Sequence, residues 1–424
     1  MLVVLSVVAA IAITGAIAAP SGSAAPRYDA DVDATIADIQ AYWAKTMPEV
    51  YGEEYQPIPS DRLFPYSQSN PPPACGGRGT MPYSEVAGNA FYCPPGDFVA
   101  WDEQVLLPKL REQFGNFAPA LVLAHEWGHA MQARVGFNPY QTVYLEQQAD
   151  CFAGAWTAHV AQGDASVEMN GDDLDTALAG LLQLRDPSGV DASQEGAHGN
   201  GFDRVGAFQD GYEGGAETCA AYETDPPTVT ESGYTSEADY ASGGDMSLAD
   251  VLPAVTDSLS SYWGEDDPKV VAYNAGDAPS CDGDTDGGVL VDTVTYCPSD
   301  NTIAYERGTM IDAHASIGDF ASGLLLAAEW SSAMSHGKGQ SLGSEAARKT
   351  ATCMTGAYAA SLDGSSGRAD SDSISLSPGD LDEVVSMLVA ADSHDGDRGT
   401  AFSRVSAFRT GFFRGAAACQ PNLA

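Results

Sequence analysis

Two histidines and a glutamate in the segment HEWGH have the types and spacing of a metal-dependent hydrolase. His125 and His129 are four residues apart, so on a helix their imidazoles lie on the same face and can reach one metal ion. Glu126 can then activate a water without binding the ion itself, as the base of a zinc hydrolase must. The segment predicts a zinc site; the alternative is a chance match, expected in roughly one such protein in a hundred or fewer.

Hydrolytic zinc sites commonly have three protein ligands, so the two histidines need a partner. A third histidine ten residues after the first is excluded, because that position is Val135. The next predicted helix offers Glu146 and Asp150, which share a face. We expect Glu146 to complete the site and Asp150 to accept a hydrogen bond from the outer nitrogen of a ligating histidine. The alternative is that both are ordinary solvated acids of a very acidic protein.

Three segments, HEWGHAMQ, EQQADCFAGAW and HGNGFDRVGAFQDGY, occur in this order and resemble the bacterial putative neutral zinc metallopeptidase family. The resemblance covers about Cys75 to Cys219 and departs from the family's usual ELQADCFAG at Gln147, a neighbour of the expected ligand. It implies a zinc-dependent peptidase acting on peptide or protein substrates. It assigns the site residues as follows: zinc on His125, His129 and Glu146, with Glu126 as base and Asp150 behind a ligand.

Two further histidines lie in the same half of the chain. His198, in the segment HGNGF, can stabilise the oxyanion that develops when water attacks a peptide carbonyl. A helix-capping or surface role for His198 is the open alternative. His159 lies in an apolar segment without partner residues, so we expect it to be structural.

The apolar pattern predicts the elements that carry these residues. Two short strands are expected at 90–93 and 98–101, joined by a turn at PPG. Helices are expected at 118–135, 141–161, 172–184 and 201–212. Together with the resemblance, this predicts an α+β, mostly helical fold: a zincin-like metallopeptidase domain with a small antiparallel sheet, duplicated in tandem.

The duplication is indicated by landmarks that recur after about residue 241. LVLAHEWGHAM matches LLLAAEWSSAM, FDRVGAFQDGY matches FSRVSAFRTGF, and four cysteines match four others at offsets of 206, 204, 202 and 200. The expected domains are a signal peptide or membrane anchor at 1–26, an intact domain at 27–223, a linker at 224–244 and a degenerate, inactive copy at 245–424. The two repeats are expected to pack against each other.

In this register the second copy keeps scaffold positions and loses the chemical ones. The matches to the proposed site, in chain order, are Ala328 for His125, Glu329 for Glu126, Ser332 for His129, Arg348 for Glu146, Thr352 for Asp150 and Arg398 for His198. Trp330 and Arg404 match Trp127 and Arg204, as expected of residues needed for packing. The sequence therefore predicts one Zn²⁺ per chain.

Eight cysteines behind an apolar leader favour disulfides over a thiolate metal cluster, because the chain has no C-x-x-C pair. If each half folds by itself, one set of pairs is favoured: Cys75 with Cys93, Cys151 with Cys219, Cys281 with Cys297, and Cys353 with Cys419.

The first nineteen residues carry no charge and indicate export. No Lys or Arg precedes the run, which is long enough to stay in a membrane, so a cleaved signal peptide and a retained anchor are both open. Either makes the protein extracytoplasmic, secreted or membrane-anchored. The formal net charge of -40 would repel phosphate backbones, so no nucleic-acid partner is expected.

The sequence thus predicts an exported zinc metallopeptidase with Glu126 as general base. Two alternatives stay open. One is a non-catalytic extracytoplasmic protein that keeps zinc only to stabilise a binding or scaffold domain. The other is a non-peptide zinc hydrolase, because water activation alone does not specify an amide bond.

Overall fold

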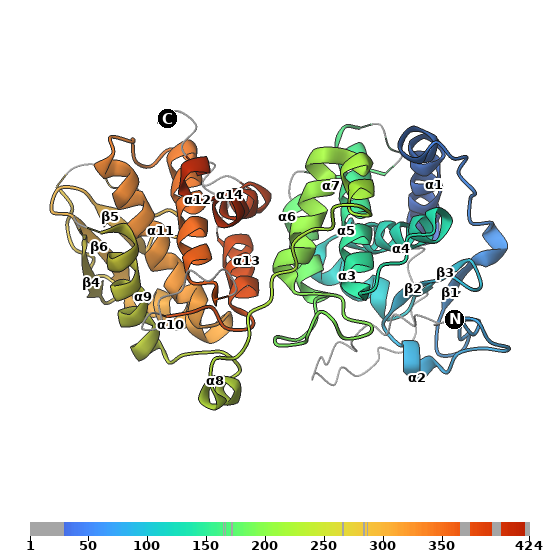
Figure 1. Cartoon of the computed structure of the whole chain (residues 1–424), viewed down its shortest axis with the longest axis horizontal. Coiled ribbons are helices and arrows are strands. Elements are labelled where there is room, and N and C mark those ends of the chain that lie inside the picture. Colours follow the sequence, from blue (N-terminus) through green and yellow to red (C-terminus); the bar gives the residue numbers. More distant parts are fainter. Residues whose placement is uncertain are drawn as a thin grey trace. The chain divides into compact units, whose positions relative to one another are not determined.

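The computed structural model describes residues 29–163, 165, 167–170, 173–264, 267–282, 285, 287–364, 374–391 and 400–419. The expected leader at 1–26 and Arg398 lie outside these ranges. The chain forms two compact units, Met1–Asp186 with Val190–Val229, and Pro187–Gly189 with Thr230–Ala424 (Figure 1). Within the described ranges, no helix is both long enough and apolar enough to cross a membrane.

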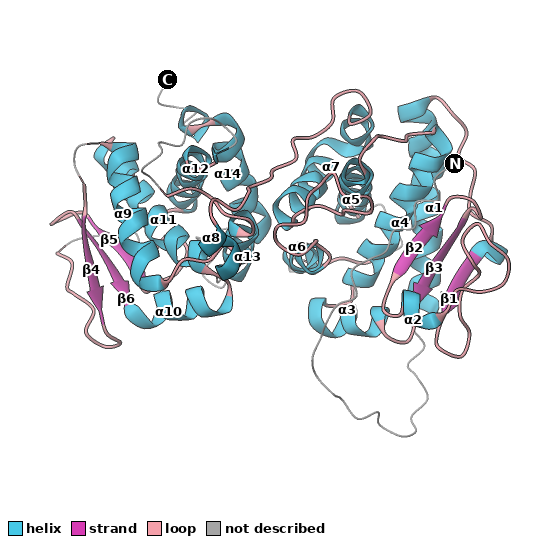
Figure 2. Ribbon diagram, turned by 60° about the horizontal axis from the view of Figure 1, so that its bottom comes forward, coloured by secondary structure: helices cyan, strands magenta, loops and turns pink. Residues whose placement is uncertain are grey.

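The first unit combines a small sheet with a bundle of helices (Figure 2). Its strands are β1 (Leu63–Tyr66), β2 (Ala90–Cys93) and β3 (Phe98–Asp102). Its helices are α1 (Asp29–Tyr51), the short α2 (Tyr83–Val86), α3 (Leu106–Phe114), α4 (Ala118–Val135), α5 (Thr142–Ala161), α6 (Asp173–Gln183) and α7 (Gly201–Ala221), with a 3-10 turn at Ser60–Arg62.

The expected antiparallel sheet is wrong in one respect. Strands β2 and β3 form the predicted antiparallel hairpin, with Phe91 opposite Ala100. However, β1 pairs with the other edge of β3 in the parallel direction, placing Leu63 opposite Val99, so the sheet is mixed. Strand β1 has only four residues, one of them Pro65. Such a segment shows no alternation and is tolerated only at a sheet edge, which is why the pattern did not predict it.

Helices α4 and α5 are the centre of the first unit. Every residue of α4 from Ala118 to Ala124 is buried, so this half of the helix is a continuous apolar run rather than an amphipathic pattern. Helix α1 covers them: Trp43 is 1 % exposed and its ring meets Phe152 edge-on at 5.0 Å. The indole of Trp156 donates to Asp38 on α1 at 2.9 Å. Helix α1 is therefore fastened to α5 by an aromatic contact and a buried hydrogen bond.

The second unit has a sheet of the same order and strand directions as the first, β4-β6-β5 against β1-β3-β2. Its strands are β4 (Lys269–Tyr273), β5 (Val294–Cys297) and β6 (Thr302–Glu306). Its helices are α8 (Glu237–Ser242), α9 (Leu248–Trp263), α10 (Arg307–Ser316), α11 (Asp319–Gly337), α12 (Glu345–Ser361), α13 (Asp380–Ala390) and α14 (Ala401–Arg414), followed by a 3-10 turn at Ala416–Cys419.

Both units also share a close helix crossing. A Cβ on Gly211 of α7 would collide with the Cys151 carbonyl of α5, and a Cβ on Gly411 of α14 would collide with the Cys353 carbonyl of α12. Glycine is needed at each crossing because the two backbones touch. The cysteine whose carbonyl lies against the glycine also forms a disulfide, Cys151 with Cys219 in the first unit and Cys353 with Cys419 in the second.

The structure contains four disulfides, in the pairs favoured from the sequence: Cys75–Cys93, Cys151–Cys219, Cys281–Cys297 and Cys353–Cys419. Each bond joins cysteines of the same half of the chain. Two of the bonds, Cys151–Cys219 and Cys353–Cys419, join cysteines that are 68 and 66 positions apart in the sequence. Because they close long loops, these bonds remove much of the conformational entropy of the unfolded chain.

Candidate metal centre

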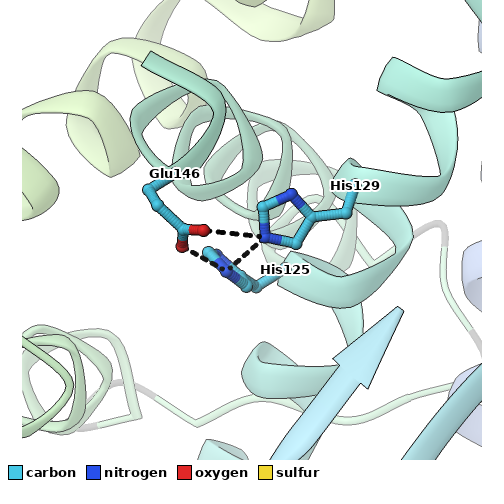
Figure 3. A group of neighbouring side chains, drawn as sticks. All are labelled: His125, His129 and Glu146. Carbon is cyan, nitrogen blue, oxygen red and sulfur yellow. Dashed lines mark hydrogen bonds and ion pairs between the residues drawn. The ribbon is translucent and has the colours of Figure 1, made fainter. Parts of the chain in front are cut away.

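His125, His129 and Glu146 point toward one another where α4 crosses α5 (Figure 3). The two Nε2 atoms are 3.1 Å apart. Glu146 approaches them with one oxygen each, at 3.3 Å from His125 Nε2 and 3.4 Å from His129 Nε2. One ligand atom from each residue lies within 4.8 Å of the other two. Two imidazole nitrogens and a carboxylate thus converge on one point.

This donor set fits zinc. Two imidazole nitrogens at 2.0–2.1 Å on a tetrahedral zinc ion are about 3.3 Å apart, close to the separation seen here. Two histidines and a carboxylate are a common set for catalytic zinc, which keeps one position for water. All three side chains are at least largely buried, with 11 %, 13 % and 6 % of their surface exposed. A cation held here would be only partly accessible, as a hydrolytic site requires.

The outer nitrogen of each histidine is held by a neighbour. His125 Nδ1 lies 2.8 Å from Asp150 Oδ1. His129 Nδ1 lies 2.9 Å from the Gln132 side-chain oxygen, and the Gln132 amide in turn donates to the Leu145 carbonyl at 2.6 Å. Such contacts fix ring orientation and leave Nε2 for the metal. Protein groups therefore set the orientation of both histidine rings.

Asp150 is itself anchored by Arg204 of α7. The guanidinium donates to both carboxylate oxygens, Nε to Oδ2 at 2.7 Å and Nη2 to Oδ1 at 2.9 Å. Its Nη1 donates to the Leu184 carbonyl. Asp150 has no exposed surface and Arg204 only 2 %. A paired, forked geometry of this kind is what makes a buried carboxylate tolerable.

The ionisable groups set one another's charge. Burial lowers the pKa of His125, but Asp150 and Glu146 outweigh it and raise that pKa to about 10. Burial also lowers the pKa of His129, which Glu146 raises above its usual value. Burial raises the pKa of Glu146, yet His129 and other neighbours hold it well below its usual range. The pocket therefore keeps ionised carboxylates beside the imidazoles and favours bound positive charge.

Gly128 lets the two ligand-bearing helices approach. A Cβ at this position would lie 2.7 Å from the Ala149 Cα and 3.0 Å from its carbonyl oxygen on α5. Ala149 lies between Glu146 and Asp150, so any displacement of α5 here moves both acids away from the histidines. The glycine inside HEWGH thus has a geometric role that its position in the motif does not reveal.

Glu126 lies beside the ligands and is 6 % exposed. Its Oε2 accepts a hydrogen bond from the Tyr92 backbone N–H of β2 at 2.8 Å. Strand β2 is an edge strand of the sheet, since it pairs only with β3 among the described strands. Glu126, the three expected ligands and His198 line one pocket, whose apolar wall includes Leu121 and Leu181.

His198 is brought to this pocket by the loop before α7. Its Nδ1 lies 3.2 Å from Asp186 Oδ1, while its backbone N–H donates to Asp186 Oδ2 at 2.6 Å. Asp186 also accepts from the Gly199 N–H at 2.9 Å. The loop is therefore folded around one carboxylate. His159 lies elsewhere, 4.0 Å from Asp38 and against the ring of Tyr42, which agrees with a structural role.

Sequence reasoning missed three of the residues that support this centre. The segment HEWGHAMQ contains Gln132 without indicating its role, the match with Arg404 predicts only a packing role for Arg204, and none of the three segments includes Asp186. Gln132 lies three residues after His129, the spacing at which helical side chains meet, so that signal was present. The other two reach the site from distant segments, and no local pattern reveals them.

In the proposed repeat register, the positions of the second unit that match the site carry different side chains. Arg348 is 9 % exposed and its Nε donates to the Gly288 carbonyl at 3.0 Å. Ala328 and Ser332 are buried on α11, and Thr352 Oγ1 donates to the Arg348 carbonyl. Glu329 is retained and accepts from the Val289 N–H at 2.6 Å. A buried guanidinium thus occupies the sequence position that matches Glu146.

Comparison with known proteins places the first unit. Residues 14–222 match the family model described as putative neutral zinc metallopeptidase. The chain is 30% identical over 165 residues, 33% of this chain and 56% of the relative, to the uncharacterized proteins Mb2605 of Mycobacterium bovis and Rv2575 of Mycobacterium tuberculosis. It is 29% identical over 149 residues, 30% of this chain and 50% of the relative, to the uncharacterized protein YpfJ of Escherichia coli K12.

The chain thus spans about half the length of the curated relatives it matches. No solved structure matches it. The matched range contains α4, α5 and the converging side chains described above. Over residues 14–222, this chain is therefore similar to the putative neutral zinc metallopeptidase family.

Proposed function

We propose that this chain is an exported zinc metallopeptidase whose single zinc site is formed by His125, His129 and Glu146. One observation carries the proposal: three ligand atoms lie within 4.8 Å of one another in the pocket that Glu126 also lines. The family of the first unit supports a zinc hydrolase. A peptide or protein substrate is proposed on the same ground.

In this proposal, bound zinc would supply Lewis-acid chemistry by acidifying a water and polarising the scissile carbonyl. Glu126 takes the proton of the attacking water and passes it to the leaving amine. The Tyr92 N–H holds the Glu126 carboxylate in place. His198, oriented by Asp186, donates a hydrogen bond to the oxyanion that develops on the substrate.

We also propose that the second unit is a degenerate copy of the first, so that the chain binds one catalytic zinc. The shared sheet order, helix crossing and disulfide pattern support this view. Arg348 supports it further, because a buried cation at the position matching Glu146 opposes metal binding. Zinc analysis should give one ion per chain; two tightly bound zinc ions would contradict the inactive copy.

Export is proposed because four disulfides persist best in an oxidising compartment. The proposal allows two fates for the N-terminal segment: cleavage as a signal peptide or retention as a membrane anchor. The mass of the mature protein from culture medium and from membranes distinguishes these two outcomes.

The central test is Glu126→Gln, with Glu329→Gln as its matched control. Glutamine keeps an oxygen that accepts from the Tyr92 N–H, so fold and zinc content should be unchanged. Hydrolysis of a mixed peptide substrate should fall at least about a hundredfold. Glu329→Gln changes the equivalent side chain in the second unit and should leave turnover unaltered.

The outcomes separate the alternatives. Unchanged turnover of the Glu126→Gln variant would refute the role of Glu126 as general base. If the wild type binds zinc but hydrolyses neither peptides nor small esters, the zinc-stabilised scaffold is favoured. Hydrolysis of esters alone, abolished by a chelator, favours a non-peptide hydrolase.

A further inference from the structure

A second group of acids gathers in the second unit, far along the sequence from the metallopeptidase motif. Asp245 follows α8, Asp319 is the first residue of α11, and Glu383 lies in the first turn of α13. One carboxylate oxygen of each lies within 4.8 Å of the other two. Asp380, the first residue of α13, lies within electrostatic reach of all three. Four acids from three segments therefore share one location.

Two of these carboxylates are buried with an oxygen that has no hydrogen-bond partner in the described part of the chain. Asp319 and Asp380 are each 4 % exposed. Asp319 Oδ2 accepts from the Met246 N–H and Asp380 Oδ2 from the Ser377 N–H, both at 2.8 Å. Among the residues that the structure describes, none forms a hydrogen bond with either Oδ1 atom. A buried acceptor left bare is costly, and native structures rarely contain one without an ion or water to satisfy it.

The backbone makes room for this crowding. Gly318 has a φ of 151°, and a Cβ there would collide with the carboxylate of Glu383. Glu383 Oε2 accepts from the Phe320 N–H at the start of α11, at 2.8 Å. The glycine therefore admits an acid to the helix N-terminus, and that acid stands beside Asp319.

Ordinary helix capping does not account for the whole group. Acids near helix N-termini are stabilised by the helix dipole, and each capping contact uses one oxygen. Capping therefore leaves the electrostatic repulsion between the carboxylates in place. Burial and then the charge of Asp319 raise the pKa of Glu383 to about 8. Either shared protons or a bound cation must relieve this repulsion.

We propose that Asp245, Asp319 and Glu383, supported by Asp380, bind a Ca²⁺ ion in the second unit. Calcium takes six to eight oxygen ligands at 2.3–2.6 Å, so oxygens on opposite sides of the ion are up to about 5 Å apart. The spacing here falls within that limit. The donors are all carboxylate oxygens, whereas zinc prefers nitrogen and sulfur.

Such an ion would fasten the segment after α8 to the N-termini of α11 and α13. Asp245 is exposed and belongs to the segment that leads into the second unit. The ion would stabilise this unit independently of the zinc site. The proposal does not rest on peptidase activity.

The test is calorimetric titration of the zinc-loaded full chain with Ca²⁺ in about 0.15 M salt, which screens loose binding to a highly acidic surface. We expect one saturable site and a higher thermal midpoint with Ca²⁺ than with a chelator of calcium. Asp245→Asn, at an exposed position that should not impair folding, and Glu383→Gln should each weaken binding at least about tenfold.

Asp173→Asn is the matched control. Asp173 begins α6 of the first unit and accepts from the Asn170 N–H at 2.7 Å, as Asp380 does from Ser377. Its replacement should leave Ca²⁺ affinity unchanged. No saturable Ca²⁺ binding by the wild type, or equal affinity in Asp245→Asn and Glu383→Gln, would overturn the proposal and favour proton sharing among the acids.

Discussion

Replacing Asp150 by Asn tests how the candidate zinc centre is built. The side chain keeps its size but loses its charge, and its single oxygen can face either His125 or Arg204, not both. In the wild type, burial raises the pKa of Asp150, but Arg204 and His125 keep it below its usual value. The residue is therefore an ionised acceptor at neutral pH, and the substitution removes that charge.

Two effects are expected of this variant, one on zinc affinity and one on stability. Loss of an acid behind a ligating histidine typically weakens metal affinity ten- to a hundredfold, or about 1.4 to 2.7 kcal/mol. Leaving Arg204 without its carboxylate costs about 3 to 5 kcal/mol. We expect about 3 kcal/mol in the metal-free protein, because the Leu184 carbonyl still accepts from the guanidinium.

Zinc affinity is measured by competition with a chromophoric chelator, and stability by denaturant unfolding of the metal-free protein. Asp186→Asn is the matched control, since Asp186 contacts His198 rather than a ligand. That control should lower turnover but keep zinc affinity. If Asp150→Asn binds zinc as tightly as the wild type, the proposed support of His125 is refuted.

Three further predictions concern the same unit. In the metal-free protein the raised pKa of His125, about 10 against 6.5, contributes stability below pH 6.5 that is lost as pH rises through 10. Zinc binding at pH 7.5 should therefore release about one proton or more. Calorimetric titration in buffers of different ionisation enthalpy measures this release, because the binding heat then varies with the buffer. The same binding heat in every buffer would contradict the prediction. Gly128→Ala should push α5 from α4 and weaken zinc binding at least about tenfold, measured by chelator competition; unchanged affinity would exclude the close approach. Removing Cys151 and Cys219 together should lower the first unit's unfolding free energy by up to about 4 kcal/mol, measured in denaturant, whereas removing Cys353 and Cys419 should spare zinc affinity.

The elements around the motif were predictable where one helix carries its own pattern. Helix α4 runs over Ala118–Val135, the range expected, and α5 begins one residue later than expected, at Thr142. Helix α7 extends to Ala221, beyond the expected end at 212, with Gly215 in a non-helical conformation inside it. Periodicity identifies a helix well but does not show where a chain resumes it after a kink.

Comparing the two halves of the sequence does not reveal every role of Arg204. Its match to Arg404 indicated a scaffold position. Arg404 does serve the scaffold, donating to the Leu388 and Ala391 carbonyls at the end of α13. Arg204 likewise donates to the Leu184 carbonyl, but it also forms a salt bridge with Asp150. Both arginines donate to backbone carbonyls, whereas the salt bridge to Asp150 comes from a residue that only the three-dimensional structure places beside Arg204.

Glu126 poses the reverse problem, because in the proposed repeat register it matches Glu329, which has no histidines at the matching positions. Both carboxylates accept a backbone N–H, from Tyr92 at 2.8 Å and from Val289 at 2.6 Å. Each thereby ties its motif helix to the neighbouring chain, and losing it would leave a buried donor unsatisfied. Retention of this glutamate is therefore no evidence of catalysis in either half. The catalytic case for Glu126 depends instead on the two histidines beside it, which the second half lacks.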